Sequence, residues 1–414
     1  MAAPHPSNFD VATAMPAGAD LPSAQSACSG TDASPLELRR LDDFGAAADF
    51  VARLGPDCLC LPYNSLTWTE AYATTLGSAS GHEPVLAGLW LGGIPVAFIP
   101  FECVSRGRLK ILRFLGQDRI NQSTGVWRRG MAGMVAPHDM QVQLRRLGKE
   151  VGADLAELAN MPAVIDGTPN PIAVGFGVSS PSPVFQGTLS DDFDSLFRSA
   201  YKRESRRKLQ KKTKALIAAG DYQIVLAATD DQIDHGLDTF IQQRQIRAAD
   251  TGIPNVFVGS DNRAFLKKLL TPAQAGAPAT LQIWWLECAG KIRATSLTSK
   301  YGHTLYGYGN SIAHDELTTF SPGIVLYNAI IADACADPAL THIDLGLGDE
   351  RYKRSWSKPV ALSDHLMPLT LPGHLATRLH LAKQALKGKI RSSERLWQLV
   401  RWIRRTKARS GKCT

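Results

Sequence analysis

Two stretches of the chain repeat the same order of apolar and polar residues. In the first, apolar runs at 85–91 and 94–99 flank a Gly-Gly pair, and in the second, runs at 281–287 and 292–300 flank Ala-Gly. Such pairs predict β-hairpins, because glycine takes the positive φ that a tight turn requires. Both hairpins follow predicted helices, and they lie about two hundred residues apart. The repetition predicts two copies of one α/β unit.

Periodic segments around the hairpins complete each unit. The expected helices lie at 43–53, 66–76, 189–219, 230–247, 263–270 and 322–335, and further strands at 109–115, 222–227, 304–308 and 342–345. We therefore predict an α/β (α+β) fold with tandem halves, each a mixed, largely antiparallel twisted sheet flanked by helices. The chain has 414 residues, more than one hydrophobic core usually organises. The predicted parts are a disordered arm at 1–35, halves at 36–185 and 186–370, and a basic helical tail at 371–414.

Composition is that of a globular protein, with 44% apolar and 20% charged residues. No basic segment followed by an apolar core begins the chain, so we expect a cytoplasmic body. The seven cysteines are scattered and lack the spacing of a metal site, so we expect free thiols and no metal.

The positive charge is concentrated in the tail. From residue 376 onward, twelve Lys or Arg face one Glu, a net charge of +11 that leaves the preceding residues at −3. Apolar residues recur at helical spacing over 375–409, with Trp397 and Trp402 among cationic neighbours. This pattern predicts an interfacial helix on an anionic membrane surface, on the inner face of the membrane. Docking of the tail onto the acidic body is the alternative.

A predicted helix begins at Phe320-Ser-Pro-Gly323, directly after the second hairpin and its third strand. The first amides of a helix lack intrahelical partners, and the helix dipole places positive charge there. Gly323 has no side chain to keep a phosphate from the backbone, so Ser321 and Gly323 are candidates for anion binding. A serine-capped helix start without a ligand is the alternative.

A charged segment follows the last predicted strand of the second half, where clefts open in α/β sheets. Here Asp349 or Glu350 is a candidate to accept a proton from an attacking amine or hydroxyl. Tyr352 and Lys353 are candidates to bind the acceptor or stabilise developing charge. A solvated turn with surface ion pairs is the alternative.

Several segments together resemble acetyltransferases of the GNAT superfamily. The more specific resemblance is to CelD-like enzymes of bacterial cellulose and exopolysaccharide loci, which are relatives of the Fem aminoacyl-transferases. It covers roughly residues 40–365 and rests on Tyr63-Asn-Ser-Leu-Thr-Trp68, Phe114-Leu-Gly116, the basic run at 201–209, Phe320–Gly323 and, most specifically, Asp344–Trp356.

The resemblance implies an acyl-CoA donor whose pyrophosphate lies at Ser321 and Gly323. It places the pantetheine arm along a strand at Thr295, Ser296 and Leu297. It implies catalysis by Asp349, Glu350 and Tyr352, with the acceptor bound by Lys353, Trp356 and Asp344. No G-x-S-x-G elbow occurs in the sequence, so we expect direct transfer without a covalent enzyme intermediate.

The acceptor expected from the resemblance is a saccharide or another small molecule of envelope biosynthesis. Two other functions remain open. A Fem-like enzyme would take its acyl group from aminoacyl-tRNA, for which the basic run at 201–214 is the support. A non-catalytic accessory protein of a polysaccharide synthase is the other. The basic run itself either holds phosphate groups or is a solvated surface.

Overall fold

The computed structural model describes residues 36–165, 167–173, 177–252, 254–273 and 277–392. The arm predicted at 1–35 and the tail beyond 392, including Trp397 and Trp402, lie outside the described residues.

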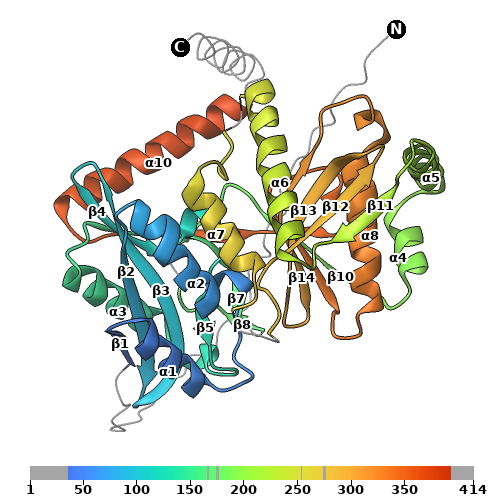
Figure 1. Cartoon of the computed structure of the whole chain (residues 1–414). Helices are drawn as coiled ribbons and strands as arrows, with labels where there is room; N and C mark the ends of the chain where they lie inside the picture. The colour runs from blue at the N-terminus through green and yellow to red at the C-terminus, as the bar shows by residue number, and fades with distance from the viewer. Residues whose placement is uncertain (1–35, 166, 174–176, 253, 274–276, 393–414) are drawn as a thin grey trace, which may run out of the picture. The chain divides into compact units, whose positions relative to one another are not determined.

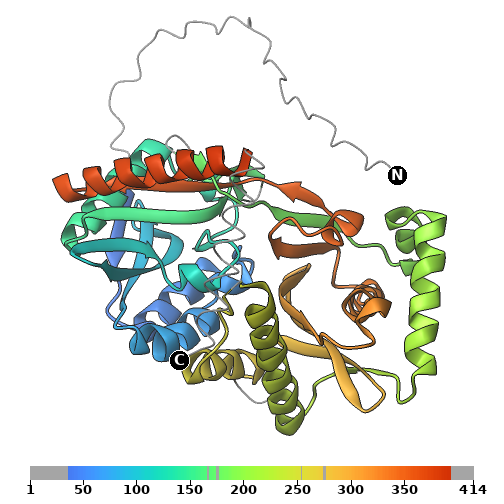
Figure 2. The same cartoon turned by 90° about the horizontal axis from the view of Figure 1, so that it is seen from above.

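The strands form two large sheets (Figures 1 and 2). In the first sheet the order is β1 (Leu36–Arg40), β2 (Glu83–Leu91), β3 (Ile94–Arg106), β4 (Leu109–Phe114), β6 (Leu155–Pro162), β17 (Leu362–Pro368) and β9 (Gly177–Ser179), with β5 (Val126–Trp127) beside β3. In the second it is β11 (Gln223–Leu226), β12 (Gln282–Cys288), β13 (Lys291–Tyr301), β14 (Thr304–Ile312), β15 (His342–Leu347), β10 (Val184–Thr188) and β16 (Lys358–Val360). A small hairpin pairs β7 (Val164–Ile165) with β8 (Thr168–Pro169).

Helices cover both sheets. They are α1 (Phe44–Leu54), α2 (Leu66–Tyr72), α3 (Pro137–Glu150), α4 (Phe193–Ala200), α5 (Arg203–Ala218), α6 (Asp230–Thr251), α7 (Ser260–Leu270), α8 (Pro322–Ala336), α9 (Lys353–Trp356) and α10 (Leu371–Ser392). The long helix predicted at 189–219 is instead two helices, because Tyr201 takes an extended conformation between them.

The predicted tandem α/β fold is confirmed. In the first half β2, β3 and β4 pair antiparallel, and β4 then pairs in parallel with β6. In the second half β12, β13 and β14 pair antiparallel, and β14 pairs in parallel with β15. Each parallel pair is joined through a helix, α3 in the first half and α8 in the second.

One strand of the predicted second half belongs to the first sheet. Strand β17 lies in the first sheet, paired with β6 and β9, although its residues fall within the predicted second half. Strand β10 lies in the second sheet, beside β15. The predicted boundaries at 185 and 370 therefore do not coincide with the division into two sheets, because β17 pairs with strands of the first sheet.

Helix α8 is a core helix. Together with the preceding turn, Thr318–Ala336 is long and apolar enough to cross a membrane. Val325, Leu326, Ile330 and Ile331 are nevertheless buried, and the helix packs against β12, β13 and β14. Its apolar character is explained by this packing.

Candidate active site

A cleft opens where β14 and β15 part. Their parallel pairing ends at Tyr306 and Asp344, although β14 continues to Ile312 and β15 to Leu347. Gly346 adopts a φ of +72° just beyond the last pair, and a Cβ there would lie 2.9 Å from the Gly307 carbonyl oxygen. Glycine at this position allows the two backbones to approach and then diverge.

The start of α8 lies beside this cleft. A cavity of about 360 Å³ is lined by Ser321 and Gly323, with Thr295, Ser296 and Tyr327 on its other walls. The Ser321 amide donates to the Thr318 carbonyl at 2.9 Å, and Pro322 has no N–H. Of the three residues 321–323, Gly323 therefore carries the amide that remains for a ligand.

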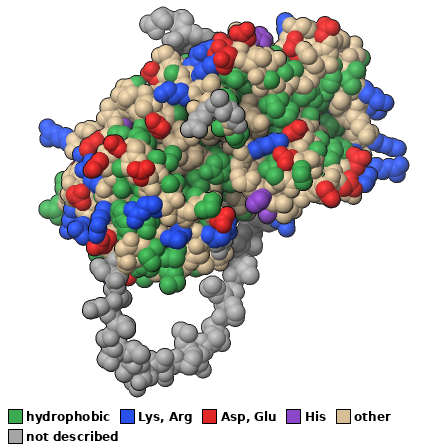
Figure 3. Space-filling view, turned by 60° about the horizontal axis from the view of Figure 1, so that its bottom comes forward, with side chains coloured by type: hydrophobic (Ala, Val, Ile, Leu, Met, Phe, Trp, Pro, Cys, Tyr) green, Lys and Arg blue, Asp and Glu red, His purple; other side chains and the backbone are tan. Residues whose placement is uncertain are grey.

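Helix α5 adds a cation to the same turn. The Lys212 ammonium donates to the Ser321 hydroxyl at 2.7 Å. Lys212 is half-buried, whereas Arg203, Arg207 and Lys211 on the same helix are exposed. Lys and Arg side chains protrude at the edge of the molecule where Figure 1 shows α5 (Figure 3). One residue of the basic run thus lies at the predicted phosphate site, and most of the run is a solvated surface.

The backbone of β13 is not free to hold a pantetheine arm. Over Thr295–Leu297 this strand is paired with β12 on one side and with β14 on the other. The backbone role expected for Thr295, Ser296 and Leu297 therefore needs correction, because both edges are occupied. Thr295 and Ser296 nevertheless line the cavity, and the free strand edge belongs to β14 beyond Tyr306.

A second, more polar cavity of about 240 Å³ adjoins the first. The two share Arg247, Ser296, Asn310, Tyr327 and Tyr352 in their linings. The Asn310 side-chain amide donates to the Tyr352 hydroxyl at 3.0 Å. Burial raises the pKa of Tyr352 far above its ordinary value, so this hydroxyl stays protonated. Tyr352 and Asn310 therefore lie at the boundary between the two cavities.

Glu350 and Lys353 line the second cavity, as a site of proton transfer or acceptor binding would require. The Glu350 carboxylate is 43% exposed and lies 3.6 Å from the Lys353 ammonium. Lys353 is buried, and its ammonium donates to the Leu347 carbonyl at 2.6 Å. Burial lowers the pKa of Lys353.

Besides Leu297, which is buried and lines neither cavity, three predicted site residues lie elsewhere. Asp349 is exposed and forms a two-pronged ion pair with Arg354, which lowers the pKa of Asp349, and it does not line either cavity. Trp356 is buried against the rings of Phe193 and Tyr201.

Asp344, the third, is 1% exposed. Its carboxylate accepts hydrogen bonds from the side chains of Gln122 at 2.6 Å and Gln186 at 2.9 Å, and from the Gly346 amide at 2.8 Å. Burial raises the pKa of Asp344. The acceptor-binding roles expected for Asp344 and Trp356 are thus replaced by packing roles, because both side chains are enclosed by protein.

Sequence reasoning missed the residues contributed by α6 and by the first half. Arg244 and Arg247 come from α6, and Asn121 comes from the first half; all three line the second cavity. The Asn121 side chain donates to the Gly307 carbonyl at 3.2 Å and to the Tyr63 hydroxyl at 2.9 Å. The Arg-x-x-Arg spacing places both guanidinium groups on one helix face, which was the available signal.

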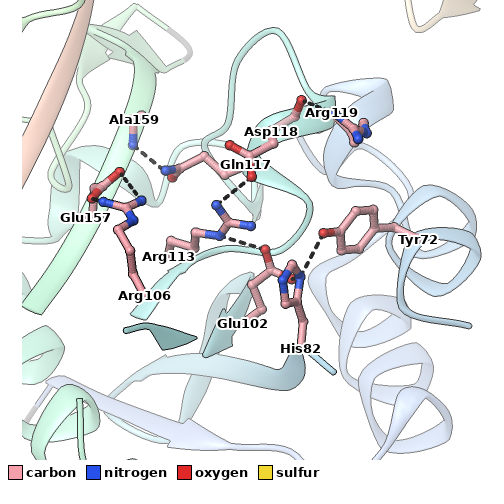
Figure 4. A network of polar contacts seen from close by, with 10 residues as sticks. All are labelled: Tyr72, His82, Glu102, Arg106, Arg113, Gln117, Asp118, Arg119, Glu157 and Ala159. Atoms are coloured by element: carbon pink, nitrogen blue, oxygen red, sulfur yellow. Dashed lines mark hydrogen bonds and ion pairs between the residues drawn. The ribbon is translucent and has the colours of Figure 1, made fainter. Parts of the chain in front are cut away.

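The corresponding place in the first half is filled by a polar network (Figure 4). The parallel pairing of β4 and β6 ends at Leu112 and Ala156. Immediately beyond, Arg113 bridges Glu102 at 2.8 Å and Asp118 at 2.7 Å. Burial raises the pKa of Glu102 to about 7.

The Gln117 side chain then bridges the parting strands by accepting from the Ala159 amide at 3.0 Å. In the second half the equivalent space is a cavity, and here it is closed by side chains. The candidate active site therefore belongs to the second half.

Comparisons with known proteins agree with this location. The family model of the acetyltransferase (GNAT) domain matches residues 203–354, which include Lys212, both arginines of α6 and the α8 turn. No curated protein sequence matches the chain.

Among solved structures, FemX is similar with a TM-score of 0.54 at 12% identity, covering 80% of this chain and 97% of FemX. L-PGS from Bacillus licheniformis has a TM-score of 0.42 at 13% identity, over 69% of this chain and 86% of L-PGS. A tandem GNAT protein from the clavulanic acid biosynthesis pathway has a TM-score of 0.41 at 11% identity, over 81% of this chain and 98% of that protein. At these identities, the similarity to FemX is one of fold. By the match of the family model, residues 203–354 correspond to an acetyltransferase (GNAT) domain, and the protein is an acyltransferase.

Proposed function

We propose that the protein transfers an acyl group from an acyl-CoA thioester directly to an amine or hydroxyl of a small acceptor. The observation that carries this proposal is the cavity beside the start of α8, which Ser321 and Gly323 line and where the Ser321 hydroxyl accepts from the Lys212 ammonium. An amide at a helix start, a hydroxyl and a cation together suit a diphosphate.

The two adjoining cavities suggest separate sites for the donor and the acceptor. The donor occupies the cavity beside α8, and the acceptor enters the polar cavity. The acceptor nitrogen or oxygen attacks the thioester carbonyl, its proton passes to Glu350, and the carbon–sulfur bond breaks. The sulfur departs as a thiolate, which accepts a hydrogen bond from the Tyr352 hydroxyl and takes its proton from solvent, while Tyr352 keeps its own proton.

We further propose a saccharide or envelope precursor as acceptor, in exopolysaccharide or cellulose biosynthesis. Its support is the CelD-like resemblance of the segments around Tyr63, Phe320 and Asp344. A cytoplasmic enzyme attached to the inner membrane face fits this role. In α10, Leu371, Leu375 and Leu379 form an exposed stripe with fractional exposures of 85%, 61% and 53%.

Aminoacyl-tRNA is the second candidate donor, favoured by the exposed cations of α5. Arg203, Arg207 and Lys211 form a surface that suits a phosphate backbone. This function predicts strongly salt-dependent tRNA binding that is lost when these three residues are neutralised together.

The decisive experiment measures donor binding and turnover separately. Thermal unfolding of the full chain with acetyl-CoA and longer acyl-CoAs tests binding, and free thiol release with an acceptor panel tests turnover. Donor-dependent stabilisation is expected, and it should weaken in Lys212→Met. No stabilisation by any acyl-CoA, together with tRNA binding, would replace the proposal by the Fem-like function. Donor binding without turnover across the panel would favour a non-catalytic accessory protein.

A further inference from the structure

The side chains that line the polar cavity carry more positive than negative charge. Among the described residues that line it, Arg244, Arg247 and Lys353 are cationic, and Glu350 is the one carboxylate. Lys353 already lies 3.6 Å from Glu350 and donates to a carbonyl. The charge of Glu350 also acts on Arg244, but one carboxylate cannot balance three cations, so the lining keeps a net positive charge.

Arg244 is held in place by apolar and backbone contacts. Its guanidinium lies 4.8 Å from the Phe257 ring centre and 5.6 Å from that of Phe240. One nitrogen donates to the Asn310 carbonyl at 2.8 Å. The Nε atom is buried and has no hydrogen-bond partner in the described part of the chain. A buried donor left in this state costs about 1–3 kcal/mol unless a ligand satisfies it.

Arg247 lies one helical turn further along α6 and lines both cavities. The i, i+3 spacing places both side chains on one face of α6. Burial first, and the charge of Arg247 second, lower the pKa of Arg244, whereas the charge of Glu350 raises it by less. No ion pair of Arg247 occurs among the described residues. Two neighbouring guanidinium groups match the oxygens of a carboxylate or phosphate, which would also relieve their repulsion.

We propose that the acceptor carries an anionic group, a carboxylate or a phosphate ester, which Arg244 and Arg247 bind in the polar cavity. This inference rests on the proposed function, because it assigns the polar cavity to the acceptor. The anionic group anchors the acceptor at α6, so that its amine or hydroxyl lies toward Glu350 and Tyr352.

The first test is anion binding to the full chain saturated with CoA, which occupies the donor cavity. Inorganic phosphate is titrated at constant ionic strength, and thermal unfolding is followed. Phosphate should stabilise the wild type, and Arg247→Ala should weaken its apparent affinity at least about tenfold, as expected for the loss of one charge-assisted hydrogen bond. Arg53→Ala, which removes an exposed arginine of α1, is the matched control and should change nothing.

The second test compares acceptors that differ only in charge, glucosamine and glucosamine 6-phosphate, with acetyl-CoA as donor. The phosphorylated member should be preferred, and Arg247→Ala should raise its KM about tenfold while leaving the neutral member nearly unchanged. Arg247→Lys should retain part of the preference. If neither sugar is acylated, the phosphate titration decides.

Three results would overturn the inference. One is the absence of phosphate stabilisation, another is an equal response of Arg53→Ala and Arg247→Ala. The third is a selective loss of succinyl-CoA over acetyl-CoA in Arg247→Ala, which would place the anion on the acyl group. Failure of the proposed function can be told apart from failure of this inference, because in the former case the protein does not bind CoA. In that case a phosphate response that needs Arg247 but not Lys212 would still locate an anion in the polar cavity.

Discussion

Replacing Lys212 by methionine tests the donor site most directly. The substitution keeps a long apolar side chain on α5 and removes the ammonium that lies 2.7 Å from the Ser321 hydroxyl. If the diphosphate of CoA binds at this turn, the variant loses one charge-assisted hydrogen bond. Such a bond contributes about 1.5–3 kcal/mol, and the partial exposure of Lys212 favours the lower end. The dissociation constant for acetyl-CoA should therefore rise about tenfold.

Titration calorimetry with acetyl-CoA and with acetylpantetheine, which lacks the phosphates, measures this loss. Lys211→Met is the matched control, because Lys211 is the neighbouring residue of α5, carries the same charge and is exposed. We expect the control to bind acetyl-CoA within about twofold of wild type, since exposed charges are screened by salt. If Lys212→Met and Lys211→Met weakened acetyl-CoA binding equally, the effect would come from the overall positive charge of α5 and not from a contact of Lys212. If Lys212→Met weakened the binding of acetylpantetheine as much as that of acetyl-CoA, Lys212 would not act on the phosphates. That result would refute the reasoning.

Three further outcomes follow from the site and the core. Glu350→Gln should lower kcat about a hundredfold with little change in acetyl-CoA affinity, measured by thiol release and calorimetry, because it removes the proton acceptor; an unchanged kcat would exclude that role. Asp344→Ala should lower the free energy of unfolding by about 1–3 kcal/mol in urea titrations, since it leaves the buried side-chain amide of Gln122 without its acceptor. A loss below 1 kcal/mol, the scale of a surface substitution, would contradict this.

Burial raises the pKa of Glu102 from 4.5 to about 7, so its contribution to stability is fully present below pH 4.5 and is lost as the pH rises through 7. Glu102→Gln should therefore flatten the pH dependence of unfolding over this window, by on the order of 3 kcal/mol at most. Parallel pH profiles of the wild type and the variant would show that Glu102 does not titrate there.

The hydrophobic pattern by itself determined the repeated α/β unit and most of its elements. The Gly turns at 92–93 and 289–290 and the apolar runs beside them are local signals, and both hairpins form where they were predicted. The start of α8 was also predicted from a local signal, because Pro322 at the first helical position favours a helix start, although the Ser321 side chain makes no capping hydrogen bond. Glu350, Tyr352 and Lys353 follow a predicted strand, and all three line the polar cavity.

Which charged residues line the site was decided by tertiary structure. Lys212 contacts Ser321, which is 109 residues away in the sequence, and Gln122 contacts Asp344, which is 222 residues away. No local pattern therefore distinguishes Lys212 from its basic neighbours. Nor does one distinguish Asp344 from an exposed carboxylate. The free edge of β14, rather than β13, follows from the pairing order of the sheet. The return of β17 to the first sheet likewise depends on backbone partners distant in the sequence. Local patterns specify elements, whereas burial and partners depend on how those elements pack, and the active site depends on both.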